Sequence, residues 1–320
     1  MAQSLLPLIF FLSLPNFRMK PTLHHSSHFS GWSSTSSRRS MPQMAYLDVV
    51  AYHARTLWLF TESDFMTTMV PISLFGMVAA PLTSLSNIPH LVFWLWFHLL
   101  GFNTSNQTAS LEDATNKPQR PIPAGRITLR HALILRWVLM PLCWLLSLAY
   151  SRQTMYASMA LSLFTWMYNE LHGNARPVSR YALNGLGFAA FEAGTSFVAR
   201  DDKTRLDSAG WLAILLSGLI FATTIFAQDF RDVVGDKLIG RDTIPIRYGA
   251  SSRTALLLGV VAWSIALSCI WQVDRWTALS FTVLAMFVGA RFVCLPTVKE
   301  DSRSYFWYNV WVTAAHALPA

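Results

Sequence analysis

Apolar stretches of membrane-spanning length recur along most of this chain. An α-helix needs about 20 predominantly apolar residues to cross the hydrocarbon core of a bilayer. The composition agrees, because 53% of the 320 residues are hydrophobic and 13% are charged, whereas soluble domains carry about 25% charged residues. The pattern predicts an all-α, polytopic membrane protein with about nine transmembrane helices, near residues 56–80, 88–106, 130–150, 153–170, 181–199, 209–228, 252–271, 277–296 and 304–318.

The positive charges are distributed unevenly around these predicted spans. Most of the 25 Lys and Arg residues fall in the N-terminal segment and in loops on one side, above all 107–129 and 229–251. The positive-inside rule places the N-terminus and these loops in the cytosol. The net charge of +8 is explained by basic residues that orient the chain in the membrane and by basic residues of a binding site in the loops. The expected partner is therefore the lipid bilayer and not nucleic acid. The expected location is the endoplasmic reticulum or another endomembrane, with the mitochondrial inner membrane as the alternative.

The N-terminal residues 1–47 differ from the rest of the chain. They are rich in Ser and His, and no acidic residue precedes Asp48. A disordered tail is predicted there, with a transit peptide as the alternative. The membrane domain is predicted to occupy residues 48–320.

Three aspartates follow the sixth predicted span. Asp229, Asp232 and Asp236 are spaced i, i+3 and i+7, so a helix would turn all three the same way. Carboxylates that repel one another need a cation, and hard oxygen ligands suit Mg²⁺. Lys237 and Arg241 follow directly, and Mg²⁺ beside Lys or Arg is a common way to bind a diphosphate. The alternative interpretation is a solvated acidic helix end.

The other long cytosolic loop has a similar make-up. The carboxylate pair Glu112 and Asp113 precedes Lys117, Arg120 and Arg126, with prolines between the cations. A stiff loop that presents Lys and Arg predicts an anion site, and a proline-rich connector is the alternative. Topology places both loops on one side of the membrane, where they could hold one diphosphate from two directions.

These motifs resemble the UbiA superfamily of intramembrane prenyltransferases. The likeness rests on the stretches Asn116-Lys-Pro-Gln-Arg-Pro-Ile-Pro-Ala-Gly and Asp232-x-x-x-Asp236-Lys-x-x-Gly-Arg-x-Thr-x-Pro, and it covers about residues 50–318. Leu57–Asp64 and Asn184-Gly-Leu-Gly-Phe look similar to fungal members, which include terpene cyclases. The resemblance implies nine transmembrane helices around a central cavity, with aspartate-rich motifs on two cytosolic loops. The first motif departs from the family, because it reads Asn106-Gln and lacks the early aspartates.

The resemblance, together with the charge pattern, assigns roles to individual residues. Lys117, Arg120, Asp232 and Asp236 are expected to be catalytic. The expected Mg²⁺ ligands are Glu112, Asp113, Asp229, Asp232 and Asp236. The cations expected to bind the diphosphate are Lys117, Arg120, Arg126, Lys237 and Arg241. The residues expected to line the cavity are Asn106, Tyr168, Asn169 and Asn184.

The expected activity is ionisation of an isoprenoid diphosphate with Mg²⁺ as cofactor, followed by transfer of the prenyl group to an acceptor. The sequence does not identify the acceptor, and an aromatic ring is one candidate. The alternative is a terpene cyclase that converts farnesyl diphosphate to a cyclic sesquiterpene. A remote alternative is an ion-coupled transporter, which would show internal repeats and acids at the bilayer midplane.

Overall fold

A computed structural model describes residues 46–79, 82, 84–109 and 112–319. It divides the chain into two units, Met1–Leu57 and Trp58–Ala320, which are described separately. In the first unit the described residues belong to helix α2 (Tyr46–Thr61), which continues into the second. The predicted disordered tail lies outside the described residues except for its last two positions.

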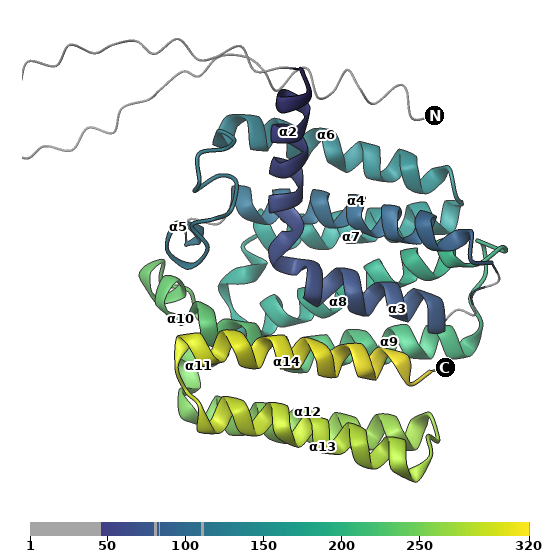
Figure 1. The fold of residues 1–320 in the computed structure, drawn as a ribbon, viewed down its shortest axis with the longest axis vertical. Coiled ribbons are helices and arrows are strands. Elements are labelled where there is room, and N and C mark those ends of the chain that lie inside the picture. The colour runs from purple at the N-terminus through teal and green to yellow at the C-terminus, as the bar shows by residue number, and fades with distance from the viewer. Residues whose placement is uncertain (1–45, 80–81, 83, 110–111, 320) are drawn as a thin grey trace, which may run out of the picture. The chain divides into compact units, whose positions relative to one another are not determined.

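The described part of the second unit consists of helices joined by turns and loops, with no strand among its described residues (Figure 1). Every predicted span after the first corresponds to one long helix. The helices are α3 (Val70–Val78), α4 (Asn87–Thr108), α5 (Asp113–Asn116), α6 (Leu129–Leu148), α7 (Arg152–Asn169), α8 (Pro177–Ala199), α9 (Ser208–Thr224), α10 (Asp229–Leu238), α11 (Ile244–Tyr248), α12 (Ala250–Ile270), α13 (Arg275–Cys294) and α14 (Val298–Ala317), with short turns η3 (Glu62–Asp64), η4 (Phe65–Met69), η5 (Gly173–Ala175) and η6 (Ile225–Gln228).

The first predicted span, 56–80, is not one continuous helix. The α-helical pattern ends at Thr61, a 3₁₀ turn and a π-helical turn follow, and α3 begins at Val70. The break falls on polar residues that face the other elements, since Ser63 accepts a hydrogen bond from Arg120 at 3.0 Å. Irregular helical turns of this kind are frequent at functional sites.

Four helical segments are long and apolar enough to cross a membrane by themselves: Leu129–Leu148, Ser208–Leu238, Ala250–Ile270 and Arg275–Cys294. The helices at the other five predicted spans do not meet the same criteria of length and hydropathy. Those helices carry more polar groups, as Glu192 in α8 and Asp301 in α14 illustrate, and both side chains are buried in the protein interior.

Helix α8 is the central element of the described fold. It contacts α3, α4, α7 and α9, while α12 and α13 pair beside α14 (Figure 1). The crossing with α9 is close: a Cβ on Gly185 would come within 2.4 Å of the carbonyl oxygen of Gly218. Small residues permit such contact between membrane helices, where packing replaces the hydrophobic effect as the main attraction.

A buried polar cluster also joins α8, α9 and α14. The Ser217 hydroxyl donates to the Glu192 carboxylate, and Ser217 Oγ lies 2.8 Å from Nε2 of His316. All three side chains are almost fully buried. Polar groups without access to water must pair with one another, so this cluster ties the three helices together.

Candidate active site

A polar cavity of about 110 Å³ lies between the two charged loops. Its walls come from α4, α5 with the loop after it, α7, α8 and α10, together with the turns η3 to η6. The structure therefore brings together the two segments that the sequence predicted would meet. Among the predicted site residues, those lining the cavity are Asn106, Glu112, Asp113, Lys117, Arg120, Tyr168, Asn184, Asp232, Asp236 and Arg241.

Helix α10 supplies two carboxylates to this cavity from one face. Asp232 and Asp236 are one turn apart, and the Lys117 ammonium lies 3.2 Å from Asp232. One guanidinium nitrogen of Arg241 contacts Asp236 at 2.9 Å and Glu112 at 2.6 Å. Arg241 thus joins a carboxylate from each loop, and it offsets their mutual repulsion.

The donor set of Glu112 and Asp236 fits a divalent cation. Each carboxylate is buried and keeps one oxygen, Oε2 of Glu112 and Oδ2 of Asp236, without a hydrogen-bond partner. Among the residues that the structure describes, no three His, Cys, Asp or Glu side chains converge on one point. Magnesium sites with phosphate ligands commonly use one or two carboxylates and complete the shell with phosphate oxygens and water. Glu112 and Asp236, with Asp232 beside them, have the chemistry for such a site.

Arg120 is held in the cavity wall by its neighbours. Its Nη1 donates to both oxygens of Asp113, at 2.9 and 2.8 Å, and its Nε is buried without a partner. Burial raises the pKa of Asp113, and the Arg120 charge opposes that shift. Burial lowers the pKa of Lys117, and the carboxylate of Asp232 opposes that shift. Both cations are therefore paired with carboxylates inside the cavity.

Asp229 has a different place from the one predicted. Its Oδ1 accepts from Arg180 at 3.0 Å and its Oδ2 from the Tyr181 hydroxyl at 2.6 Å. Asp229 is fully buried and does not line the cavity, so its assignment as a metal ligand is revised. It positions Arg180, a lining residue that the sequence analysis did not single out. The sequence did carry a signal for Arg180, because a charged residue at the start of an otherwise apolar helix is unusual.

Three other predicted residues also lie outside the cavity lining. Lys237 follows Asp236 on α10 and is exposed, because successive side chains on a helix point about 100° apart. Arg126 is half-buried beyond the lining. Asn169 stands behind the wall and donates to Oδ1 of Asn106 at 2.9 Å. Direct binding of diphosphate by Lys237 or Arg126 has no support in this geometry.

Asn116 joins the two loops and was missed as a functional residue. Its amide donates to the carbonyl of Asp232 at 3.2 Å and accepts from the backbone N–H of Gly235 at 3.1 Å. A Cβ on Gly235 would lie 2.4 to 2.5 Å from the Asn116 amide atoms, so only glycine permits this approach. The signal in the sequence was a glycine between Asp232 and Asp236.

Replacing Gly235 with alanine is expected to lower stability by about 1–3 kcal/mol, because the added methyl overpacks the Asn116 contact. Thermal unfolding of the purified protein in detergent measures this. Gly259→Ala is the matched control, since its Cβ would meet nothing closer than 3.9 Å. An unchanged melting temperature for Gly235→Ala would contradict the proposed contact between the loops.

An apolar chamber adjoins the polar cavity. Phe102, Tyr168 and Phe188 line both spaces, as do Thr68 and Asn184. The other walls of the chamber are formed by the apolar side chains of Phe164, Leu183 and Phe191. Thr165 and Gly187 complete the lining. The lining of the two adjoining spaces is charged at one end and apolar at the other, which is the chemistry that an anionic head and an apolar chain would contact.

Residues 69–310 match the model of the UbiA prenyltransferase family. The chain belongs to this family. The fumagillin beta-trans-bergamotene synthase af520 of Aspergillus fumigatus is 32% identical over 267 residues, which cover 83% of this chain and 91% of that protein. The diterpene cyclase eriG of Hericium erinaceus is 28% identical over 287 residues, which cover 78% and 82%. The fold is also that of a UbiA homolog from Archaeoglobus fulgidus bound to GPP and Mg²⁺, with a TM-score of 0.58, 14% identity, and coverage of 82% and 99%.

Membership of the UbiA family confirms the resemblance drawn from the two loop motifs. This UbiA protein is an integral membrane enzyme, of prenyltransferase or terpene cyclase type. The family match leaves the transporter alternative without support.

Proposed function

We propose that this UbiA enzyme uses Mg²⁺ to ionise an isoprenoid diphosphate and closes the resulting cation on its own chain, as a terpene cyclase. The observation that carries the proposal is the polar cavity of paired carboxylates and cations that continues into an aromatic chamber. The names of the Aspergillus synthase and the Hericium cyclase favour cyclisation over the transfer that the sequence analysis ranked first, while a second Hericium relative, also 28% identical, is named a polyprenyl transferase.

Lys117, Arg120 and Arg241 are placed to stabilise the negative charge that develops on the departing diphosphate. A magnesium ion held by Glu112 and Asp236, with Asp232 beside them, would neutralise more of that charge as a Lewis acid. The carbon–oxygen bond breaks, its electron pair leaves with the diphosphate, and an allylic cation remains. Arg180, held by Asp229, adds a further cation to the same wall.

The chamber is suited to the second half of the reaction. The rings of Tyr168 and Phe188 lie at the junction of the two spaces, where their faces can stabilise a carbocation. The apolar walls exclude water, which would otherwise capture the cation. A distal double bond of the substrate attacks the cation, and the loss of one proton to the released diphosphate leaves a neutral hydrocarbon.

Prenyl transfer to a separate acceptor is the second candidate. It shares the ionisation step and the same residues, and the description of the family as prenyltransferases favours it. The two candidates differ only in which nucleophile reaches the cation.

The proposal includes nine membrane spans with both charged loops in the cytosol. It is supported by the long helices that occupy eight of the nine predicted stretches and by the basic residues gathered in those loops. In that arrangement the polar cavity opens toward the cytosol, where water-soluble diphosphates are available.

Product analysis tests the proposed function. Membranes that contain the protein are incubated with farnesyl diphosphate and Mg²⁺ but no acceptor, and the extract is analysed by gas chromatography with mass spectrometry. The expected result is a cyclic hydrocarbon that disappears when EDTA removes the metal. A prenylated product that forms only after an aromatic acceptor is added would favour transfer. Hydrocarbon formation undiminished in EDTA would contradict the metal-dependent mechanism.

A further inference from the structure

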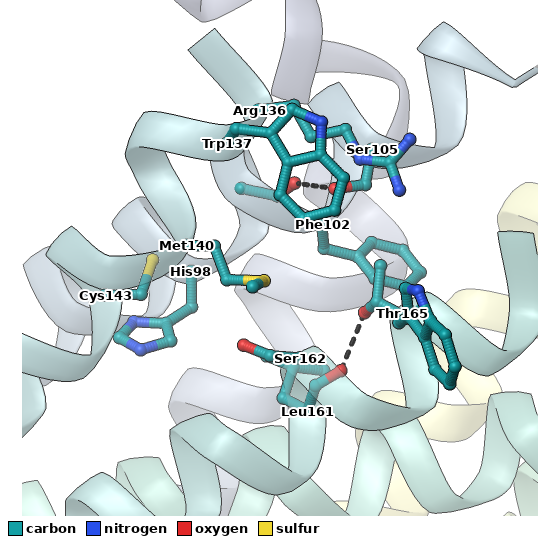
Figure 2. Close-up of a pocket in the computed structure, with 12 residues that line it drawn as sticks. His98, Phe102, Ser105, Arg136, Trp137, Met140, Cys143, Leu161, Ser162 and Thr165 are labelled. Atoms are coloured by element: carbon teal, nitrogen blue, oxygen red, sulfur yellow. Dashed lines mark hydrogen bonds between the residues drawn. The ribbon is translucent and has the colours of Figure 1, made fainter. Parts of the chain in front are cut away.

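A second apolar space lies on the other side of the chamber wall. This cleft runs between α4, α6 and α7 and includes Gly101 and Ser105 of α4, Met140 of α6 and Ser162 of α7 (Figure 2). Trp137 beside it is 50% exposed, so the cleft borders the lipid-facing surface. The proposed reaction assigns no role to this space.

The polar groups of the cleft are already satisfied by the protein. The Ser105 hydroxyl donates to the carbonyl of Gly101 at 3.0 Å, and Thr165 donates to that of Leu161 at 2.7 Å (Figure 2). At the deeper end, Nε2 of His98 lies 2.8 Å from the hydroxyl of Ser158. Hydroxyls bound to their own helix leave a mostly apolar surface, which suits a hydrocarbon chain.

Only two residues line both the chamber and the cleft among the described walls, namely Phe102 and Thr165. Thr165 is a short side chain bound to its own backbone, so the ring of Phe102 is the larger part of the wall. That ring packs edge-on against Phe191, with ring centres 5.8 Å apart. Phe102 also lines the polar cavity, so it stands where all three spaces meet.

We propose that Phe102 sets the length of the isoprenoid chain that this enzyme accepts. The ring closes the chamber against the cleft and stops the chain there. Without the ring, the tail of a longer isoprenoid diphosphate passes between α4, α6 and α7. This inference rests on the proposed function, because it takes the chamber to be the site of the isoprenoid chain.

The test compares two substrates that differ by one isoprene unit. Phe102→Ala is expected to raise the ratio of kcat/KM for geranylgeranyl diphosphate over farnesyl diphosphate by about tenfold or more, a typical effect of pocket size on apolar specificity. The matched control is Phe93→Ala, which removes the same ring from α4 at a position that is 43% exposed and outside all three linings. Its ratio is expected to equal that of the unmodified protein. Phe102→Leu provides a milder change if the alanine variant does not fold.

A second variant and a binding measurement separate this inference from the proposed function. Phe102→Ala combined with Ser162→Phe refills the cleft from α7 and is expected to restore the original preference. Binding is followed by the shift in melting temperature with farnesyl and geranylgeranyl thiolodiphosphates in the presence of Mg²⁺. If Phe102→Ala and Phe102→Leu both keep the original substrate preference and still bind farnesyl thiolodiphosphate, the role of Phe102 is overturned while the proposed function stands. If the unmodified protein binds neither analogue, the proposed function fails and this inference with it.

Discussion

Asp236→Asn is expected to reduce turnover of an isoprenoid diphosphate by about 10²–10³-fold, the size of effect seen when one group that stabilises transition-state charge is removed. The substitution keeps the shape of the side chain but removes the negative charge that faces Glu112 across Arg241. Turnover is measured as product formed per molecule of purified protein at saturating Mg²⁺. Asp232→Asn is expected to act in the same direction, because Asp232 pairs with Lys117 in the same cavity.

Asp242→Asn is the matched control for this experiment. Asp242 lies in the same segment, but its side chain is 38% exposed and pairs with Arg247 outside the cavity. Its turnover is expected to stay within about twofold of the unmodified protein, as is usual for a surface ion pair. Near-normal turnover in Asp236→Asn would remove the basis for the site assignment. Melting temperatures of both variants show whether a loss reflects chemistry or unfolding.

Glu112→Gln and Asp113→Asn are expected to fail in different ways, although the residues are adjacent. Glu112 has a buried oxygen without a partner beside Asp236, so Glu112→Gln should raise the Mg²⁺ concentration for half-maximal rate by about 10–100-fold. Both oxygens of Asp113 are occupied by Arg120. Asp113→Asn should therefore leave the Mg²⁺ requirement unchanged and raise KM for the diphosphate, because Arg120 loses the charge of its nearest carboxylate partner. Titration of Mg²⁺ and of substrate in each variant measures both effects.

The same shift in Mg²⁺ requirement for both variants would contradict this division of roles. Glu300→Gln is a suitable control, because Glu300 pairs with Arg291 and Arg303 and does not line the cavity. Neither its Mg²⁺ requirement nor its KM is expected to change.

The helices were predictable from the sequence because a bilayer admits few alternatives. An apolar stretch that crosses lipid must satisfy its own backbone hydrogen bonds, so hydropathy alone located the eight long helices α4, α6, α7, α8, α9, α12, α13 and α14. The prediction of one continuous helix over residues 56–80 was wrong, because Glu62, Ser63 and Asp64 interrupt the apolar stretch. Asp64 lies 3.6 Å from Arg120, which is an interaction between distant parts of the chain that hydropathy does not record.

The candidate site was predictable only in part. Spacing on a helix placed Asp232 and Asp236 together, and the structure confirms that they share one cavity with Lys117 and Arg120. Spacing could not show that Asp229 would turn to Arg180, because Arg180 lies on another helix, 49 residues away in the sequence. The contact between Asn116 and Gly235 was hidden for the same reason.

A structure of the protein with farnesyl thiolodiphosphate and Mg²⁺, determined by electron cryomicroscopy, tests the central claim most directly. The claim is that the two charged loops form one site for a metal-bound diphosphate. The account predicts diphosphate density beside Lys117, Arg120 and Arg241, with a metal about 2.1 Å from oxygens of Glu112 and Asp236. Diphosphate density outside this cavity would contradict the claim. Diphosphate density inside the cavity with no metal at Glu112 and Asp236 would contradict it as well.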